Sequence, residues 1–384
     1  MKKNYLMTPG PTPVPSEVLL AGARPMIHHR TPEFESVVRE CVTGLQYIFQ
    51  TSNDVLIFAS SGTGAMESAI ANCFCAGDKI LVTQNGKFGE RMAAIAQVYG
   101  LNVQLLAYGW QTVVSPTDIA EFLTANPDTR GVVVTQSETS AGILNDVQAV
   151  GAITRNYPEC VLIVDSITGI GAVECRTDEW ALDVVMTGSQ KGLMLPPGLS
   201  AVSVSAKAWA ACQRSTLPKY YFDWQKYQKD LQQNTTPFTP AVSLMIGLAE
   251  SLKLMRAEGL ENIIARHARL AAAMRQGCEA LGLVLFAPAE GRGNAVTPVW
   301  VPEGVDGKKL VNLMKDQYGV TVADGQDDYK GRIFRVGHLG YFGDFDIITT
   351  LAALEMSLQA LGYEFEAGSG IRAAEAVLMG QGKD

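Results

Sequence analysis

Between residues 54 and 188 the chain alternates short apolar runs rich in Val and Ile with amphipathic segments, and Gly or polar residues separate them. Strands that alternate with helices in this way run parallel, because each helix carries the chain back to the start of the next strand. The pattern therefore predicts an α/β fold with a mostly parallel sheet covered by helices. Strands are expected at residues 55–59, 79–83, 103–107, 132–135, 161–165 and 184–187, with helices at residues 33–50, 63–75, 88–99, 117–123 and 147–156.

Changes in composition and in the pattern of apolar residues along the chain predict four regions. Residues 1–16 form a Pro- and Gly-rich N-terminal arm, which cannot be helical and is expected to lie across the body of the protein. Long helical stretches within residues 240–282 then bridge two domains. We expect a large domain at residues 17–255, a small C-terminal α+β domain at residues 256–366, and a tail of open role at residues 367–384.

Composition and charge exclude several classes of partner. The net charge is −8 and no block of basic residues occurs, which argues against a nucleic-acid partner. No run reaches the roughly 18 apolar residues that a membrane span needs, and prolines interrupt the first twenty residues where a signal peptide would be apolar. Seven scattered cysteines indicate reduced thiols, and Cys73 and Cys75 lack the further ligands of a metal site. A soluble, cytoplasmic protein without a metal is expected.

Lys191 is the residue whose surroundings in the sequence most clearly suggest a catalytic role. It follows an apolar strand and is the only charged residue between Asp183 and Lys207. Burial in such a place lowers the pKa of an ammonium group, which lets the amine act as a nucleophile or base near neutral pH. A surface lysine at the end of a strand is the alternative that this segment leaves open.

Other candidate ligand residues follow other strands, at the sheet edge where α/β proteins bind ligands. The small residues Ser61, Gly62 and Thr63 lead into a helix and could cradle a phosphate, or could form an ordinary capped turn. Asp165 ends a buried strand, so its carboxylate needs a cation such as a protonated ring nitrogen, or caps the next element. Phe88 could stack on a planar ligand or belong to the core.

Together these residue types describe a site for a flat, phosphorylated, nitrogen-containing ring that a lysine holds covalently. The phosphate cradle, the aromatic face, the carboxylate and the amine correspond in turn to the phosphate, the ring, the ring nitrogen and the aldehyde of one cofactor. The sequence therefore predicts a site for pyridoxal 5′-phosphate.

An ordered series of motifs runs along the chain between Pro9 and about Gly362. These motifs are Ser61-Gly62-Thr63-Gly64-Ala65-Met66-Glu67, Asn85-Gly86-Lys87-Phe88-Gly89, Glu138-Thr139-Ser140-Ala141-Gly142, Val164-Asp165-Ser166, Gly188-Ser189-Gln190-Lys191, Thr236-Pro237-Phe238-Thr239-Pro240 and Phe334-Arg335-Val336-Gly337. They resemble those of the class-V aminotransferases, above all the alanine–glyoxylate and serine–glyoxylate (serine–pyruvate) enzymes. The chain also resembles cyanobacterial proteins labelled soluble hydrogenase small subunit. The resemblance implies a fold-type I transferase with a seven-stranded sheet in the large domain.

The same resemblance implies a role for each matched residue. Lys191 would bind the cofactor aldehyde and transfer protons, and Asp165 would pair with the ring nitrogen. Arg335 would grip the substrate carboxylate, and Gly10 would either line the substrate pocket or form a packing turn. The remaining implied cofactor contacts are Ser61, Gly62 and Thr63 at the phosphate, Phe88 and Ile167 at the ring faces, Thr139 and Gln190 as hydrogen-bonding neighbours, and Thr236 and Thr239 across a dimer interface.

The activity implied is transfer of an amino group from alanine or serine to glyoxylate, in a homodimer whose active sites lie at the interface. A cysteine desulfurase is disfavoured because no cysteine follows Cys278. Phosphono-substrates are disfavoured, although Arg332 or Lys330 could bind them. Two alternatives belong to other functional classes. One is an aminotransferase-fold subunit associated with a soluble hydrogenase complex, and the other is a binding protein without catalytic activity.

Overall fold

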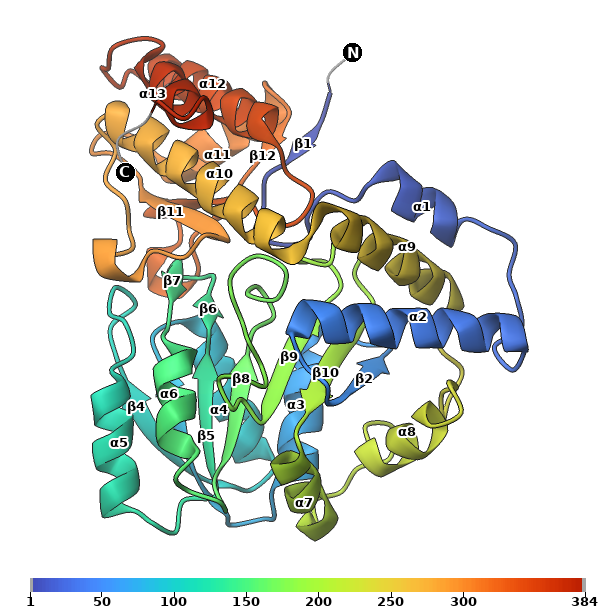
Figure 1. The fold of residues 1–384 in the computed structure, drawn as a ribbon. Coiled ribbons are helices and arrows are strands. Elements are labelled where there is room, and N and C mark those ends of the chain that lie inside the picture. Colours follow the sequence, from blue (N-terminus) through green and yellow to red (C-terminus); the bar gives the residue numbers. More distant parts are fainter. Residues whose placement is uncertain (1–2, 382–384) are drawn as a thin grey trace.

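The computed structural model describes residues 3–381, and its central feature is the predicted parallel sheet. Within these residues the large sheet has seven strands, and β3, β4, β5, β8 and β9 pair in parallel (Figure 1). This arrangement confirms the α/β class. Across the sheet the order is β2 (Asp54–Phe58), β10 (Ser200–Val204), β9 (Val184–Gly188), β8 (Val161–Asp165), β5 (Gly131–Thr135), β3 (Lys79–Gln84) and β4 (Asn102–Ala107).

Strand β10 is the one strand of this sheet that the alternation of strands and helices did not predict. It runs antiparallel to both β9 and β2, so that Val202 pairs with Met186 on one side and with Leu56 on the other. Its sequence, Ser-Ala-Val-Ser-Val, is short and carries two serines, and therefore gives a weak strand signal. The two neighbouring strands supply the hydrogen bonds that fix it.

Helices cover both faces of the sheet because successive strand residues point to opposite sides. In β5, Val132 and Val134 pack into one apolar core, and Val133 packs into the other. The first core is covered by α2 (Pro32–Phe49), α5 (Pro116–Ala125), α6 (Val147–Thr154) and α9 (Val242–Glu258), and the second by α3 (Gly62–Cys73), α4 (Lys87–Val98), α7 (Ala206–Arg214) and α8 (Trp224–Leu231).

The C-terminal part, coloured orange to red in Figure 1, has a core of its own around a small antiparallel sheet. The sheet has the order β11 (Val296–Trp300), β14 (Ile333–Gly337), β13 (Ala323–Asp324). Helix α13 lies in the segment predicted as a tail, and its Ala374 is buried in this core. The domain boundaries given above stay predictions. The helices here are α10 (Leu260–Ala280), α11 (Gly307–Asp316), α12 (Asp344–Ala360) and α13 (Ser369–Leu378), with short 3₁₀ turns at Ala289–Gly291 and Asp327–Tyr329.

The N-terminal arm joins the two parts of the molecule. Strand β1 (Tyr5–Leu6) pairs in parallel with β12 (Val320–Thr321) of the C-terminal part, and α1 (Ser16–Gly22) packs on α9. Between them the arm passes over the end of β9. A separate hairpin, β6 (Ser137–Glu138) with β7 (Ile143–Leu144), follows β5. None of the helices formed by residues 3–381 has the length and apolar character needed to span a bilayer.

Candidate active site

Lys191 lies just beyond the end of β9, and the N-terminal arm covers it. Its side chain is almost fully buried, and Nζ donates a hydrogen bond to the Pro9 carbonyl oxygen at 2.5 Å. Gly10 follows with a φ of +127°, and a Cβ atom there would lie 2.4 Å from Nζ. Gly10 is therefore required where the arm touches the lysine. Burial, reinforced by the charge of Arg335, lowers the pKa of Lys191 to about 8.

Asp165 ends β8, the strand next to β9, as the sequence predicted for a buried strand. It is 2% exposed, and its Oδ1 accepts a hydrogen bond from the Ile167 N–H at 3.0 Å. Burial raises the pKa of Asp165 to about 7. A cation beside this carboxyl group would lower its pKa again and keep it ionised, which is the environment that a protonated ring nitrogen provides.

Gln190 and Ile167 lie close to the start of α3. A Cβ atom on Gly62 would be 2.5 Å from Ile167 Cδ1, so a larger residue there would require the Ile167 side chain to move. The Gln190 Oε1 atom is buried without a hydrogen-bond partner. A buried acceptor of this kind costs stability unless a donor reaches it. The orphaned Oε1 atom indicates that a ligand supplies the missing donor.

The start of α3 has the features of an anion cradle. The first N–H groups of a helix lack partners within the helix, and the helix dipole adds partial positive charge there. Ser61 occupies the N-cap position but makes no side-chain capping bond. Gly62 is buried and Thr63 half-buried at the first two helical positions. These N–H groups are placed to receive a phosphate.

Phe88 is held at the start of α4 by Glu138, whose role was not assigned from the sequence. Glu138 is fully buried, and its Oε2 accepts hydrogen bonds from the N–H groups of Phe88 at 2.9 Å and Gly89 at 3.3 Å. Its Oε1 accepts from the Ser140 hydroxyl at 2.6 Å, and the Ser140 Oγ accepts from the Lys87 N–H. Glu138 thus replaces the missing side-chain cap at Gly86 and fixes the predicted stacking residue.

Arg335 extends from β14 and is 7% exposed. Its Nε donates to the Asp324 carbonyl oxygen at 2.9 Å, and its Nη1 donates to the Thr139 carbonyl oxygen at 3.1 Å and to Gln326 Oε1 at 3.4 Å. No ion pair within residues 3–381 involves this guanidinium. Burial lowers the pKa of Arg335 to about 10, so the guanidinium stays charged near neutral pH. This charge is therefore available to a carboxylate ligand.

Thr236 and Thr239 lie apart from these residues. The Thr236 hydroxyl donates to the Phe238 carbonyl oxygen at 2.8 Å, and Thr239 is exposed beside a surface groove formed with residues 26–29 and 240–244. Among the contacts of residues 3–381, none joins either threonine to Lys191 or Asp165. Their predicted place at a partner's phosphate stays a prediction.

The other predicted site residues meet at the carboxyl ends of β2, β3, β5, β8 and β9, where the arm and β14 close over them. The roles of the Glu138 carboxylate and the Pro9 carbonyl group had no separate signal in the sequence, since each binds a group from a distant segment that only folding brings close. Among residues 3–381 no cluster of three or more His, Cys, Asp or Glu side chains could hold a metal ion.

Comparison with known proteins identifies the class to which this fold and site belong. The family described as Aminotransferase class-V matches residues 4–329. The structure of a ureidoglycine–glyoxylate aminotransferase from Bacillus subtilis superposes with a TM-score of 0.93 at 29% sequence identity, covering 99% of both chains. The chain belongs to the class-V aminotransferase family. It is a fold-type I transaminase, and its cofactor is pyridoxal 5′-phosphate.

Individual relatives carry different names. The chain is 46% identical to a soluble hydrogenase small subunit from Synechococcus sp. (strain PCC 6716), over 98% of both chains. It is 37% identical to an L-aspartate–glyoxylate aminotransferase from Paracoccus denitrificans, over 97% of this chain and 96% of the other. It is 35% identical to a serine–glyoxylate aminotransferase from Methylorubrum extorquens, over 98% and 96%. The two aminotransferase names share glyoxylate and differ in the amino donor.

Proposed function

We propose that this transaminase moves an amino group from a small neutral L-amino acid, alanine or serine, to glyoxylate, forming glycine with pyruvate or hydroxypyruvate. The observation that carries the proposal is the isolation of Arg335. One buried guanidinium without an acidic partner suits one substrate carboxylate. The groups bonded to it are neutral, namely the Gln326 amide and the carbonyl groups of Thr139 and Asp324.

A donor with a second carboxylate would need a second free cation beside Arg335, where Lys87 and Arg332 both have other contacts. Lys87 Nζ pairs with Asp327 at 2.7 Å and with Glu90 at 3.3 Å. The Arg332 guanidinium lies over the rings of Trp300 and Tyr329. These contacts favour alanine or serine over aspartate, and they disfavour phosphono-substrates.

Each predicted residue has a task that its surroundings support. Pyridoxal 5′-phosphate, when bound, supplies an aldehyde for amines and a ring that accepts electrons from the substrate Cα atom. Asp165 would hold the proton on the ring nitrogen. Lys191, with its pKa near 8, would bind the aldehyde and carry the proton from Cα as a general acid–base. Arg335 would orient the substrate through its carboxylate.

A visible-absorption titration tests the proposal. Purified protein loaded with pyridoxal 5′-phosphate would receive L-alanine, L-serine or L-aspartate in separate samples, followed by glyoxylate. We expect alanine or serine to bleach the band of the lysine-bound cofactor and glyoxylate to restore it. Bleaching by aspartate alone would contradict the proposed donor, and absence of any band after cofactor addition would contradict the assignment of Lys191.

We further propose a homodimer in which Thr236 and Thr239 reach the partner's phosphate site. The groove beside Thr239 supports this, because Met26 on its rim is 70% exposed. Analytical ultracentrifugation tests whether the chain forms a dimer. The affinity of the Thr239→Ala variant for the cofactor tests whether this threonine reaches the phosphate site. A monomer, or unchanged affinity, would contradict the proposal.

We also propose a cytoplasmic location, which the seven free cysteines support.

Association with a hydrogenase complex is the second candidate, and the name of the 46% identical relative favours it. This role and transamination are separable by experiment. Under the docking hypothesis the purified chain would show no turnover with any donor and would co-sediment with a larger redox complex from native extract. Full turnover by the isolated chain would show that its activity needs no such complex.

A further inference from the structure

Arg91 on α4 is a half-buried cation, and no acidic side chain among residues 3–381 forms an ion pair with it. It lies one helical turn after Phe88, and its guanidinium carbon is 4.9 Å from the centre of the Phe88 ring. Its Nη1 donates to the Thr63 Oγ1 atom at 3.3 Å. A ring face and a neutral hydroxyl group leave most of its charge uncompensated.

The position of Arg91 brings this charge to the anion cradle. Thr63 is the second residue of α3, at the helix end that carries partial positive charge and lacks a side-chain cap. Because the Thr63 oxygen accepts the bond from Arg91, its own O–H remains free to donate to an anion. The charge of Arg91 also favours the ionised form of Asp165 and disfavours the ionised form of Lys191, although burial is the main cause of both pKa shifts.

We propose that Arg91 binds the phosphate group of the cofactor, together with the N–H groups at the start of α3. A guanidinium offers several donors in a fork that matches phosphate oxygens, so it suits this role. The proposal rests on the site assigned above and adds one residue to it. The competing interpretation is that Arg91 only positions Thr63 and Phe88, which would affect the ring of the cofactor as much as its phosphate.

Rebinding of cofactor to the phosphate-free apoprotein separates these roles. Dissociation constants of pyridoxal 5′-phosphate and of pyridoxal, which lacks the phosphate, would be measured for wild type, Arg91→Gln and Arg91→Lys. We expect Arg91→Gln to bind pyridoxal 5′-phosphate about 10- to 100-fold more weakly, the usual range for a hydrogen bond to a charged group. Its affinity for pyridoxal should stay within about twofold of wild type, with Arg91→Lys intermediate for the phosphorylated form.

The matched control is Arg256→Gln, since Arg256 lies 5.2 Å over the Tyr47 ring in a comparable contact on α9. It should leave both affinities unchanged. Inorganic phosphate gives a second readout, because it should compete with pyridoxal 5′-phosphate in wild type and much less in Arg91→Gln. Equal weakening of both ligands, or no weakening, overturns the proposal. If wild type binds the two ligands equally well, the phosphate site at α3 fails as well.

Discussion

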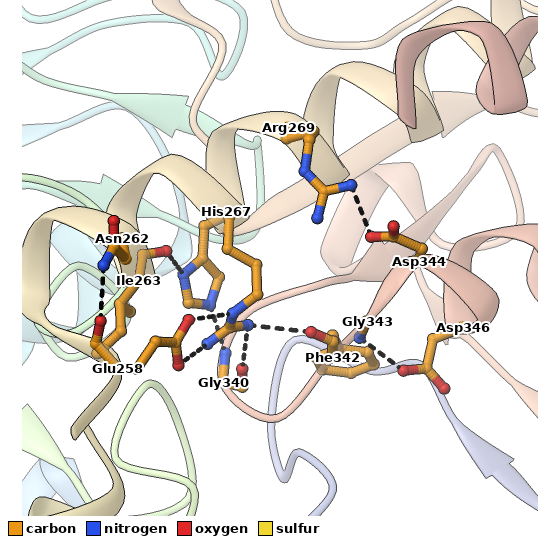
Figure 2. A network of polar contacts seen from close by, with 11 residues as sticks. Glu258, Asn262, Ile263, His267, Arg269, Gly340, Phe342, Gly343, Asp344 and Asp346 are labelled. Carbon is orange, nitrogen blue, oxygen red and sulfur yellow. Dashed lines mark hydrogen bonds and ion pairs between the residues drawn. The ribbon is translucent and has the colours of Figure 1, made fainter. Parts of the chain in front are cut away.

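Two polar clusters meet at Gly340, and they differ in how completely their charges are paired. A Cβ atom on Gly340 would lie 3.0 Å from the Lys191 carbonyl oxygen, so the loop around it lies directly behind Lys191. On one side is the candidate active site, with Lys191 and Arg335 lacking acidic partners. On the other side is the network shown in Figure 2.

In that second network the charges and ring nitrogens are satisfied. Arg266 binds both oxygens of Glu258, at 2.6 and 3.1 Å, and donates to the carbonyl oxygens of Gly340 and Phe342. His267 is fully buried, with Nδ1 bonded to the Ile263 carbonyl oxygen and Nε2 accepting from the Gly340 N–H (Figure 2). Burial lowers the pKa of His267 to about 3, so the ring stays neutral.

The difference separates a structural joint from a binding site. Complete pairing in the Glu258–Arg266–His267 network holds α10 against the loop behind Lys191, and it leaves no group for a ligand. Incomplete pairing of buried groups around Lys191, Gln190 and Arg335 is costly unless a ligand supplies the missing partners. The four predictions below test this contrast.

The largest effect is expected for Lys191→Ala. Loss of the amine removes both the covalent attachment and the proton carrier, so turnover should fall by at least about 1000-fold. A donor–acceptor assay with alanine and glyoxylate measures it. Lys253→Ala, at an exposed position on α9, serves as the control. Turnover within tenfold of wild type would contradict the role of Lys191.

Arg335→Gln should cost about 100-fold in kcat/KM, mainly through KM, because the substrate carboxylate loses its charged partner. Arg335→Lys should recover part of the loss, since a lysine supplies the charge without the fork of donors. Steady-state kinetics with alanine and serine measure both variants. An unchanged KM would show that another group binds the carboxylate.

Glu258→Gln should affect stability rather than chemistry. Arg266 would lose its acidic partner in a half-buried place, which should lower the free energy of unfolding by about 1 to 2 kcal/mol. Chemical denaturation measures this, and kcat should stay within about threefold of wild type at 20 °C. A tenfold loss of kcat without loss of stability would mean that the two clusters are not functionally distinct.

The smallest effect concerns pH. The pKa of Lys191 is lowered to about 8, so its amine is protonated below that pH and nucleophilic above it. The rate at which cofactor-free protein takes up pyridoxal 5′-phosphate should therefore rise with pH to a plateau above about 8. In Arg335→Gln the midpoint should shift upward, since removal of a nearby positive charge favours the ammonium form. Stopped-flow absorption measures both profiles, and a midpoint above 10 in wild type would contradict the burial argument.

Much of the fold could be predicted from the sequence because the signals are local. The apolar runs ending at Asp165 and Gly188 identify two central strands of the sheet, and the small residues around Gly62 identify a strand-to-helix turn. Strand β10 lacked such a signal, since two neighbouring strands define it. The helix in the predicted tail, α13, is likewise stabilised by packing on α10.

The sequence by itself determined the alternation of strands and helices, the lone lysine after β9 and the carboxylate at the end of β8, because each depends on residues adjacent in the chain. Only the tertiary structure decided how the site is completed. It brought the Pro9 carbonyl group to Lys191 across 182 positions, Glu138 to the start of α4, and Arg91 to Thr63. Contacts between distant segments leave no periodic trace in the sequence, so the long-range polar partners could be known only from the folded chain.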